Sequence, residues 1–214
     1  MNIVIFDTET TSIDKPFCYN VGYVIADITN EKILEKKDFV VEQIWHNLPL
    51  FQSAYYANKR PLYVKDLRSR KTLLKKYGTI MQIMANDFRK YNVQYAFAYN
   101  SPFDDKVFSF NCDWFHCKNP FDTIPIFDIR GYFHEILDGN FLTFCESNQC
   151  FTESGNYSTT AETVKRYITN DMNYVECHTA LADALDEYDI LKFCLSHNLK
   201  IDGNYNAKIS LTNQ

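Results

Sequence analysis

The sequence of 214 residues contains no run of about 18 uncharged apolar residues, the length that a helix needs to cross a membrane. Its first seven residues also lack the basic region and the cleavage site of a secretory signal peptide. No internal repeat and no long linker divides the chain. These absences predict a cytoplasmic protein without a membrane segment, folded as one domain over residues 1–200 and followed by a loosely held tail at 201–214.

Positive charge is also scarce. The chain has 22 Lys and Arg residues against 27 Asp and Glu residues, which gives a net charge of -5. This balance excludes a protein that coats nucleic acid through general positive charge, because Lys and Arg drive that kind of binding to phosphates. Hydrophobic residues make up 46% of the chain and charged residues 23%, as in ordinary soluble globular proteins.

The seven cysteines are an odd number in a chain of this size, which fits reduced thiols better than a disulfide framework. Four of them form two Cys-x4-Cys pairs, Cys112 with Cys117 and Cys145 with Cys150. A zinc site made of both pairs is one alternative. The spacing is loose for structural zinc, and aromatic residues flank the second pair as in a core segment, so free and partly buried thiols are favoured.

The hydrophobic pattern predicts an α/β fold. Short apolar runs predict five strands at residues 2–6, 21–28, 33–41, 95–99 and 126–129, with a hairpin turn at 29–32. Apolar residues at spacings of three and four predict a helix through Leu73, Leu74, Tyr77, Ile80, Met81, Met84 and Phe88. Further helices are expected after residue 100, at 160–168 and at 178–197, whereas the polar segment 145–160 is expected to be a surface excursion. This order predicts a mixed five-stranded sheet flanked by helices.

Two acidic residues follow the first strand. Asp7 and Glu9 are two residues apart, so in an extended chain both side chains point to one face, about 7 Å apart along the backbone. At that spacing they can share a metal ion. Taken alone, an Asp-x-Glu pair after a strand is more often a solvated turn.

A third acid occurs where the strand at 95–99 gives way to a helix, in Asn100-Ser101-Pro102-Phe103-Asp104. Asp105 competes with Asp104 for this place. One residue along a helix turns a side chain by about 100°, so only one of the two can face a common site. The alternative is that both complement the positive end of the helix dipole.

The last feature is His178-Thr179-Ala180-Leu181-Ala182-Asp183, which the pattern assigns to the final helix. Five residues of helix rotate a side chain by about 500°, so His178 and Asp183 are expected to diverge and to reach different sides of one substrate phosphate. Taken singly, His178 could be a buried partner at a helix start and Asp183 a solvated helix acid.

Together these three motifs resemble the DEDDh family of DnaQ-like 3′→5′ exonucleases, over residues 3 to about 195. The matching segments are Phe6-Asp7-Thr8-Glu9-Thr10-Thr11, then Asn100 through Phe103-Asp104, then His178 through Asp183. In the sister class a Tyr stands four residues before the last Asp, where this chain has Thr179. His178 therefore decides the subclass. The resemblance implies an RNase H-like fold.

The resemblance also implies a chemistry. Asp7, Glu9, Asp104 and Asp183 would hold two divalent cations, Mg²⁺ or Mn²⁺, and His178 would accept the proton of the attacking water. The implied contacts to the terminal nucleotide come from Thr8, Thr10, Thr11, Asn100 and Phe103. The implied product is a nucleoside 5′-monophosphate, released from a single strand with a free 3′ end, with DNA favoured over RNA. An acidic site of this kind takes its positive charge from the metal, in agreement with the net charge.

Alternatives stay open beside this interpretation. One is a non-catalytic nucleic-acid-binding module of the same fold, and another is a small-molecule phosphohydrolase with a similar metal site. The chain could act alone or as a subunit of a polymerase or replication assembly, and its oligomeric state is undetermined. Residues 59–76 hold eight Lys and Arg side chains near Tyr55, Tyr56, Tyr63 and Tyr77. They predict a surface that guides the strand, with a solvated helix face as the alternative.

Overall fold

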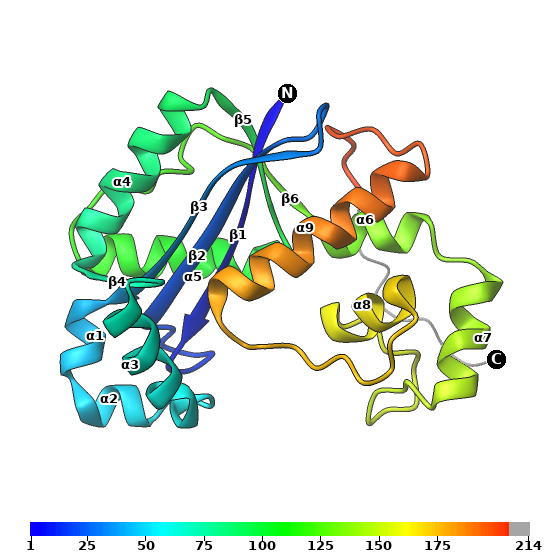
Figure 1. Cartoon of the computed structure of the whole chain (residues 1–214), viewed down its shortest axis with the longest axis horizontal. Coiled ribbons are helices and arrows are strands. Elements are labelled where there is room, and N and C mark those ends of the chain that lie inside the picture. The colour runs from blue at the N-terminus through cyan, green and yellow to red at the C-terminus, as the bar shows by residue number, and fades with distance from the viewer. Residues whose placement is uncertain (206–214) are drawn as a thin grey trace.

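The computed structural model describes residues 1–205, which form a central six-stranded sheet with helices on both faces (Figure 1). The order across the sheet is β4-β3-β2-β1-β5-β6. The strands are β1 (Asn2–Thr10), β2 (Cys18–Asp27), β3 (Lys32–Val41), β4 (Leu73–Lys75), β5 (Val93–Ala98) and β6 (Ile126–Asp128). The first three strands pair antiparallel, whereas β4, β5 and β6 each pair parallel to a neighbour. The predicted mixed α/β sheet is thus confirmed.

The prediction of five strands was wrong by one, because β4 was assigned to a helix. Leu73 and Leu74 continue the apolar spacing of the following helix, yet they pair with Phe39 and Val40 at the edge of β3. The helix begins only at Tyr77. A strand of three residues is too short to show a period of two, so its pairing partner, and not its own pattern, determines its structure.

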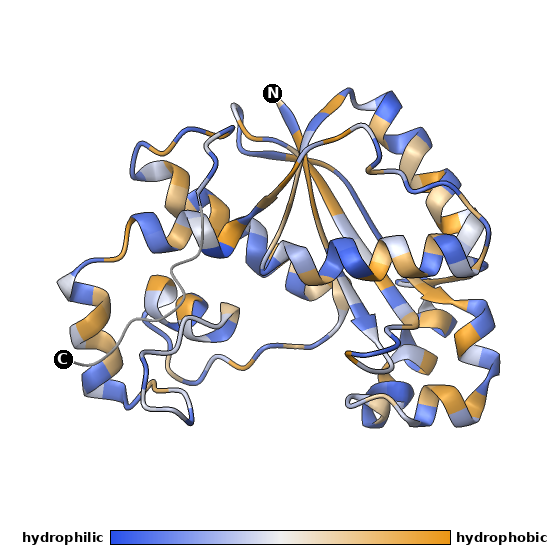
Figure 2. Ribbon diagram, turned by 180° about the vertical axis from the view of Figure 1, so that it is seen from behind, coloured by the Kyte–Doolittle hydropathy of each residue, from blue (hydrophilic) through white to orange (hydrophobic). Residues whose placement is uncertain are grey.

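Helices cover the two faces of the sheet in separate groups (Figures 1 and 2). The elements are α1 (Glu42–His46), α2 (Leu48–Gln52), η1 (Ala57–Lys59), α3 (Arg60–Ser69), α4 (Tyr77–Lys90), α5 (Ser101–Trp114), α6 (Ile129–Glu135), α7 (Gly139–Asn148), α8 (Ala161–Thr169) and α9 (Ala180–Ser196). Side chains alternate along β1, so Val4 and Phe6 pack toward α4 and α5, whereas Ile3 and Ile5 pack toward α6 and α9. The sheet therefore separates two hydrophobic clusters.

The segment 145–160 is only in part the surface excursion that its polarity predicted, because residues 152–155 are exposed but some other residues of the segment are buried. Cys145 lies in α7, and Cys145, Cys150 and Tyr157 are all buried in the cluster around α6 and α9. Phe151 and Tyr157 form a β-bridge that closes the segment on itself. Cys145, Cys150 and Tyr157 therefore pack a mostly polar segment against the hydrophobic cluster.

The two cysteine pairs lie on opposite faces of the sheet. Cys112 and Cys117 belong to the cluster at α4 and α5, whereas Cys145 and Cys150 belong to the other cluster. The pairs cannot bind one ion together, which excludes the alternative of a shared zinc site. The favoured interpretation holds, because all seven cysteines are free thiols and five of them are buried.

The predicted tail at 201–214 falls mostly outside the described residues. Within the described part, Tyr132 of α6 donates a hydrogen bond from its hydroxyl to the carbonyl of Ile201 at 2.7 Å, and its ring contacts the ring of Tyr205. Residues 201–205 are thus packed against α6. Across residues 1–205, no helix combines the length and the apolar character that a membrane crossing requires.

The start of α9 lies directly against the backbone of β2 at Gly22. A methyl group at Gly22 would stand 2.1 Å from the amide nitrogen of Leu181 and 2.2 Å from the carbonyl carbon of Ala180. These are backbone atoms, so they cannot move aside as the end of a flexible side chain would. Gly22 is paired with Asp7 across the β1–β2 ladder. The absence of a side chain at Gly22 therefore brings the first turn of α9 next to Asp7.

We predict that Gly22→Ala lowers the free energy of unfolding by about 1–3 kcal/mol, because α9 must move away from the sheet. Chemical denaturation of the purified protein measures this change. Gly139→Ala is the matched control, since no atom lies within 4 Å of the added methyl group in α7. An equal effect of both substitutions would contradict the close packing of α9 on Gly22.

Candidate functional site

Asp7 and Glu9 lie on the face of β1 that α9 covers. They share this face with Ile3 and Ile5, because side chains alternate along a strand. Glu9 is 8% exposed and accepts a hydrogen bond from the hydroxyl of Tyr19 at 3.3 Å, whereas Asp7 is more accessible. The two acids thus point to one side of the sheet, as the sequence predicted.

Asp104 joins them from the first turn of α5. It is 3% exposed, and its Oδ1 accepts a hydrogen bond from the hydroxyl of Thr8 at 2.6 Å. Asp105 is exposed to solvent, so the structure selects Asp104 from the two competing acids. Thr8 lies between Asp7 and Glu9 in the sequence, and its hydrogen bond ties the first motif to the second.

Asp183 and His178 complete the group from the other side. One ligand atom from each of Glu9, His178 and Asp183 lies within 4.8 Å of the other two. The expectation that His178 and Asp183 diverge along one helix was wrong, because α9 begins only at Ala180. His178 precedes the helix in a left-handed conformation with a φ of 51°, which turns its ring back toward Glu9.

The ring of His178 is held by a segment that the sequence motifs did not reveal. Tyr56 stacks on it with 4.1 Å between ring centroids, and the Tyr56 hydroxyl lies 3.2 Å from Nε2. On the other side, Oε2 of Glu176 lies 3.8 Å from Nδ1. Lys59 donates from Nζ to the carbonyl of Cys177 at 2.8 Å, next to His178 in the chain. The partners in these two hydrogen-bonding contacts are 122 and 118 positions apart in the chain, so the spacing of residues in the sequence gives no indication of them.

Burial and mutual repulsion change the protonation of these groups. Burial and the nearby charges of Asp104, Glu187, Asp183 and Glu9 raise the pKa of Asp7 well above its ordinary value. Burial raises the pKa of Glu9 to about 7 and that of Asp104 to about 7. Burial, with the charges of Glu176 and Glu9, raises the pKa of Asp183 to about 9. In contrast, burial and then the charge of Lys59 lower the pKa of His178, which favours a neutral ring.

The donor atoms of the site suit a hard divalent cation. Among the described residues, Oδ1 of Asp183 and Oε2 of Glu187 are buried without any hydrogen-bond partner. A buried carboxylate without a partner is costly, so an added cation would stabilise it. Carboxylate oxygens are the ligands that Mg²⁺ and Mn²⁺ prefer. Asp7, Glu9, Asp104 and Asp183 therefore fit the pair of cations that the sequence resemblance implied.

The residues expected to contact the terminal nucleotide lie around the same end of β1. The hydroxyl of Thr8 is engaged by Asp104, and Thr11 is buried with its amide bonded to the carbonyl of Phe17 at 2.9 Å. Thr10 is partly exposed. Asn100 is exposed in a left-handed conformation at the start of α5, and Phe103 packs against the core. Asn100 is therefore the most exposed of the five residues, and Thr10 and Phe103 are partly exposed.

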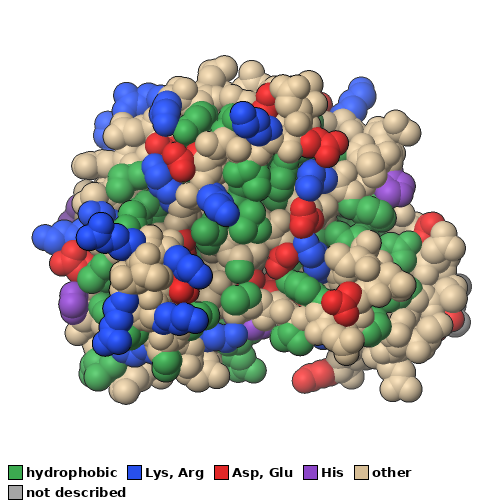
Figure 3. Space-filling model, in the orientation of Figure 1, with side chains coloured by type: hydrophobic (Ala, Val, Ile, Leu, Met, Phe, Trp, Pro, Cys, Tyr) green, Lys and Arg blue, Asp and Glu red, His purple; other side chains and the backbone are tan. Residues whose placement is uncertain are grey.

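Basic side chains gather beside the site over α3 and β4, where Figure 3 shows a concentration of Lys and Arg. Within residues 1–205, the side chains that are exposed in this region are Lys65, Arg68, Arg70, Lys71, Lys75 and Lys76. No salt bridge of the described chain involves a Lys or Arg of residues 59–76. Tyr63 and Tyr77 are core residues, so of the four tyrosines only Tyr55 and Tyr56 could stack on bases. The strand-guiding surface stays a prediction.

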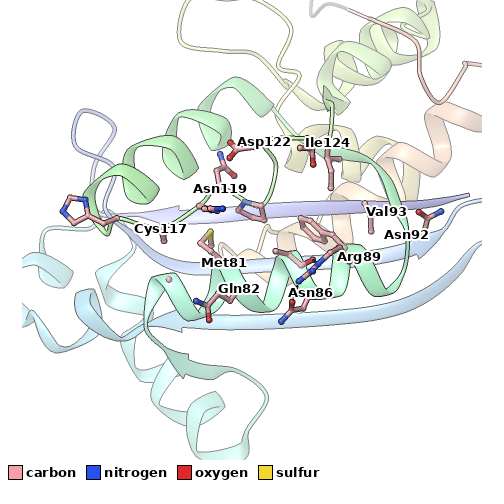
Figure 4. Close-up of a pocket in the computed structure, with 17 residues that line it drawn as sticks. Met81, Gln82, Asn86, Arg89, Asn92, Val93, Cys117, Asn119, Asp122 and Ile124 are labelled. Carbon is pink, nitrogen blue, oxygen red and sulfur yellow. Dashed lines mark hydrogen bonds between the residues drawn. The ribbon is translucent and has the colours of Figure 1, made fainter.

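A cavity of about 1110 Å³ lies elsewhere, between α4 and residues 116–124 (Figure 4). Met81, Gln82, Asn86 and Arg89 of α4 line one side of it. None of the five site residues lines this cavity. The carboxylate cluster therefore lies outside this cavity.

No protein-family profile matches the sequence, and no curated protein sequence matches it. Solved structures do match. The nuclease domain of 3'hExo, a DEDDh family member bound to rAMP, superposes with a TM-score of 0.62 at 13% sequence identity, covering 95% of this chain and 96% of that chain. The chain has the fold of DEDDh exonuclease domains. The predicted RNase H-like architecture is confirmed by this likeness.

Two structures of exonuclease I from E. coli share the DEDDh fold with this chain. The complex with a dA16 oligonucleotide has a TM-score of 0.53 at 13% identity, covering 91% of this chain and 41% of that chain. The zinc-bound form of the enzyme with single-stranded DNA has a TM-score of 0.54 at 13% identity, covering 92% and 40%. This chain thus spans about two fifths of exonuclease I.

We predict that the protein without divalent cations becomes less stable as the pH rises from about 6 to about 9. The pKa values of Glu9, Asp104 and Asp183 are about 7, 7 and 9 in the folded protein, against about 4 for unfolded Asp and Glu. The folded state binds more protons in this window, so its stability is complete below the unfolded pKa and is lost as pH rises through the folded values.

The temperature of thermal unfolding in EDTA and in Mn²⁺, followed across this range, checks the prediction. Mn²⁺ should raise the unfolding temperature most at the alkaline end, because cations bind deprotonated carboxylates. Asp183→Asn should flatten the dependence in EDTA. An unfolding temperature in EDTA that climbs between about pH 6 and pH 9 would contradict the assigned proton uptake.

Proposed function

We propose that the protein is a metal-dependent 3′→5′ exonuclease that shortens single-stranded nucleic acid from its free 3′ end. The observation that carries this proposal is the convergence of Asp7, Glu9, Asp104, His178 and Asp183 at one end of the sheet. These side chains come from three separate parts of the chain, so their meeting is a property of the fold. The DEDDh fold of the chain supports the same function.

Asp7, Glu9, Asp104 and Asp183 would hold two divalent cations, Mg²⁺ or Mn²⁺. When bound, such cations lower the pKa of a water nucleophile and stabilise the charge on the leaving oxygen. The zinc ion in the exonuclease I structure supports a divalent cation in this fold. The hydrogen bond from Thr8 would keep Asp104 aligned with Asp7. The four carboxylates would thereby orient the terminal phosphate relative to the attacking water.

His178 would accept the proton of that water. Its lowered pKa keeps the ring neutral at neutral pH, and a neutral ring can accept a proton. Glu176 beside Nδ1 favours the tautomer with the proton on that nitrogen, which leaves Nε2 as the acceptor. The Tyr56 hydroxyl already lies at hydrogen-bond distance from Nε2. A water in a comparable position would be suitably placed to lose its proton.

The substrate would be a single strand, with DNA favoured over RNA, and the product a nucleoside 5′-monophosphate. The ligands of the structural neighbours support this class, since 3'hExo was bound to rAMP and exonuclease I to deoxyoligonucleotides. Thr8, Thr10, Thr11, Asn100 and Phe103 would surround the terminal nucleotide. The preference for DNA rests on the family resemblance alone and depends on contacts near the sugar 2′ position.

Two predictions test this function, and the first concerns cleavage itself. A 5′-labelled single-stranded DNA and its RNA counterpart should each be incubated with Mg²⁺, Mn²⁺ or EDTA. We expect a ladder that shrinks from the 3′ end with either cation, no ladder in EDTA, and none with Asp7→Asn. Asp105→Asn is the matched control, because Asp105 is exposed next to Asp104 and should leave the ladder unchanged. Strand binding without cleavage under every condition would instead support the non-catalytic binding module.

The second prediction separates the base from the metal ligands. His178→Ala should slow hydrolysis by about 10²–10⁴-fold, the usual contribution of a general base. Mn²⁺ affinity, measured by calorimetric titration, should stay close to that of the wild type. His197→Ala is the control, since His197 is exposed near the end of α9. Full activity of the His178 variant would rule out this residue as the proton acceptor.

A further inference from the structure

Glu187 is a fifth carboxylate at the site, and no sequence motif pointed to it. It lies in α9 four residues after Asp183, which places both side chains on the same face of the helix. Its side chain is deeply buried, at 4% exposure. The backbone amide of Tyr99 at the end of β5 donates a hydrogen bond to it, yet Oε2 has no partner among the described residues.

Glu187 faces the Asp104 side of the cluster. Apart from burial, the strongest influence on its protonation is the charge of Asp104, followed among the acids by Asp183. In turn, Asp104 and Glu187 are the two charges that most affect Asp7. The ligand atoms of Glu9, His178 and Asp183 form one group. Glu187 therefore interacts electrostatically with the carboxylate cluster but is not part of the group formed by Glu9, His178 and Asp183.

The protein supplies no positive side chain to Glu187, although it does so for other acids of α9. Lys165 contacts Asp186 at 2.9 Å and Asp189 at 2.6 Å, whereas no salt bridge within residues 1–205 includes Glu187. The acids of α9 are thus of two kinds. Asp186 and Asp189 have a counterion in the fold, whereas Asp183 and Glu187 take part in no salt bridge of the described residues. A buried carboxylate in this situation is either neutral or paired with a bound cation.

We propose that Glu187 is an additional metal ligand, with Oε2 binding one of the divalent cations of the carboxylate cluster. The proposal rests on the proposed function and deepens it, because the metal centre then has five carboxylates in place of the four in the sequence motifs. The unpartnered oxygen, the depth of burial and the position one helical turn after Asp183 carry the inference. The alternative is a protonated glutamic acid that only fills space beneath the site.

The two alternatives differ in how Glu187→Gln changes metal binding. Gln has the size of Glu and is neutral, so replacing a protonated acid leaves cation affinity unchanged. Replacing a ligand removes one oxygen and one negative charge. We expect the wild type to bind two Mn²⁺ ions, and Glu187→Gln to bind one of them about 10–100-fold more weakly. Calorimetric titration of the full chain with Mn²⁺ alone measures both sites, and the spectrum of free Mn²⁺ in electron paramagnetic resonance confirms the number bound.

Asp189→Asn is the matched control, because it removes a negative charge from the same helix at a residue paired with Lys165 and Lys192. It should leave both Mn²⁺ affinities unchanged. Glu187→Asp provides a second test that keeps the charge but withdraws the carboxylate by one methylene group. We expect this variant also to weaken one site, and thermal unfolding in EDTA verifies that each variant is folded.

The outcomes distinguish this inference from the proposed function. Two Mn²⁺ ions bound with wild-type affinity by Glu187→Gln, or by Glu187→Asp should the Gln variant not fold, overturn the role of Glu187 and leave the exonuclease proposal intact. A wild-type protein that binds no Mn²⁺ overturns both. Selective weakening of one site in the Glu187 variants, with Asp189→Asn unchanged, establishes the fifth ligand.

Discussion

The approach of α9 to the backbone of β2 is the contact on which the site depends. Asn20 and Gly22 of β2 are paired with Glu9 and Asp7 of β1, so the residues that receive the helix lie beside the residues that carry the acids. Asn20 accepts a hydrogen bond from the amide of Ala180 at 2.8 Å. It thereby caps α9 from a neighbouring strand, since the helix has no side-chain cap of its own. A polar contact and a missing side chain together determine where the first turn of α9 lies.

Placing α9 at this point brings several buried acids together at a cost in stability. Each acid raises the pKa of its neighbours. Within the described residues, no salt bridge joins a Lys or Arg to Asp7, Asp183 or Glu187. The hydrophobic clusters on both sides of the sheet offset this repulsion. Positive charge is instead placed around the site, on Lys165 at one side and on the exposed side chains of α3 at the other. This distribution leaves the centre available to a cation from solution.

The parts of the site that are set by local sequence could be predicted. An acid at the end of an apolar strand or in the first turn of a helix has the same position in most α/β folds, and Asp7, Glu9 and Asp104 follow that rule. The conformation of His178 could not be predicted in this way. The sequence pattern assigned His178 to the final helix, whereas its φ of 51° places it before the helix, which begins at Ala180. Glu187 was visible as an acid one turn after Asp183. In the sequence, however, it resembles Asp186 and Asp189, and only the packing of α9 shows which of them is buried.

The fold builds the proposed metal ligands and the proposed proton acceptor from different elements. The carboxylates stand on β1 and on the first turns of α5 and α9, all of which the central sheet supports. His178 stands on a loop and is held by Tyr56 and Lys59, which belong to the segment between β3 and β4. The same segment continues into α3, where basic side chains are exposed. The segment also contacts the sheet, because Tyr63 of α3 donates a hydrogen bond to Oδ1 of Asn20 in β2 at 3.0 Å and the ring of Tyr19 packs against Phe51 and Tyr63. The segment that positions His178 therefore also contacts Asn20, the residue of β2 that caps α9, so the position of His178 and that of Asp183 depend on connected parts of the fold.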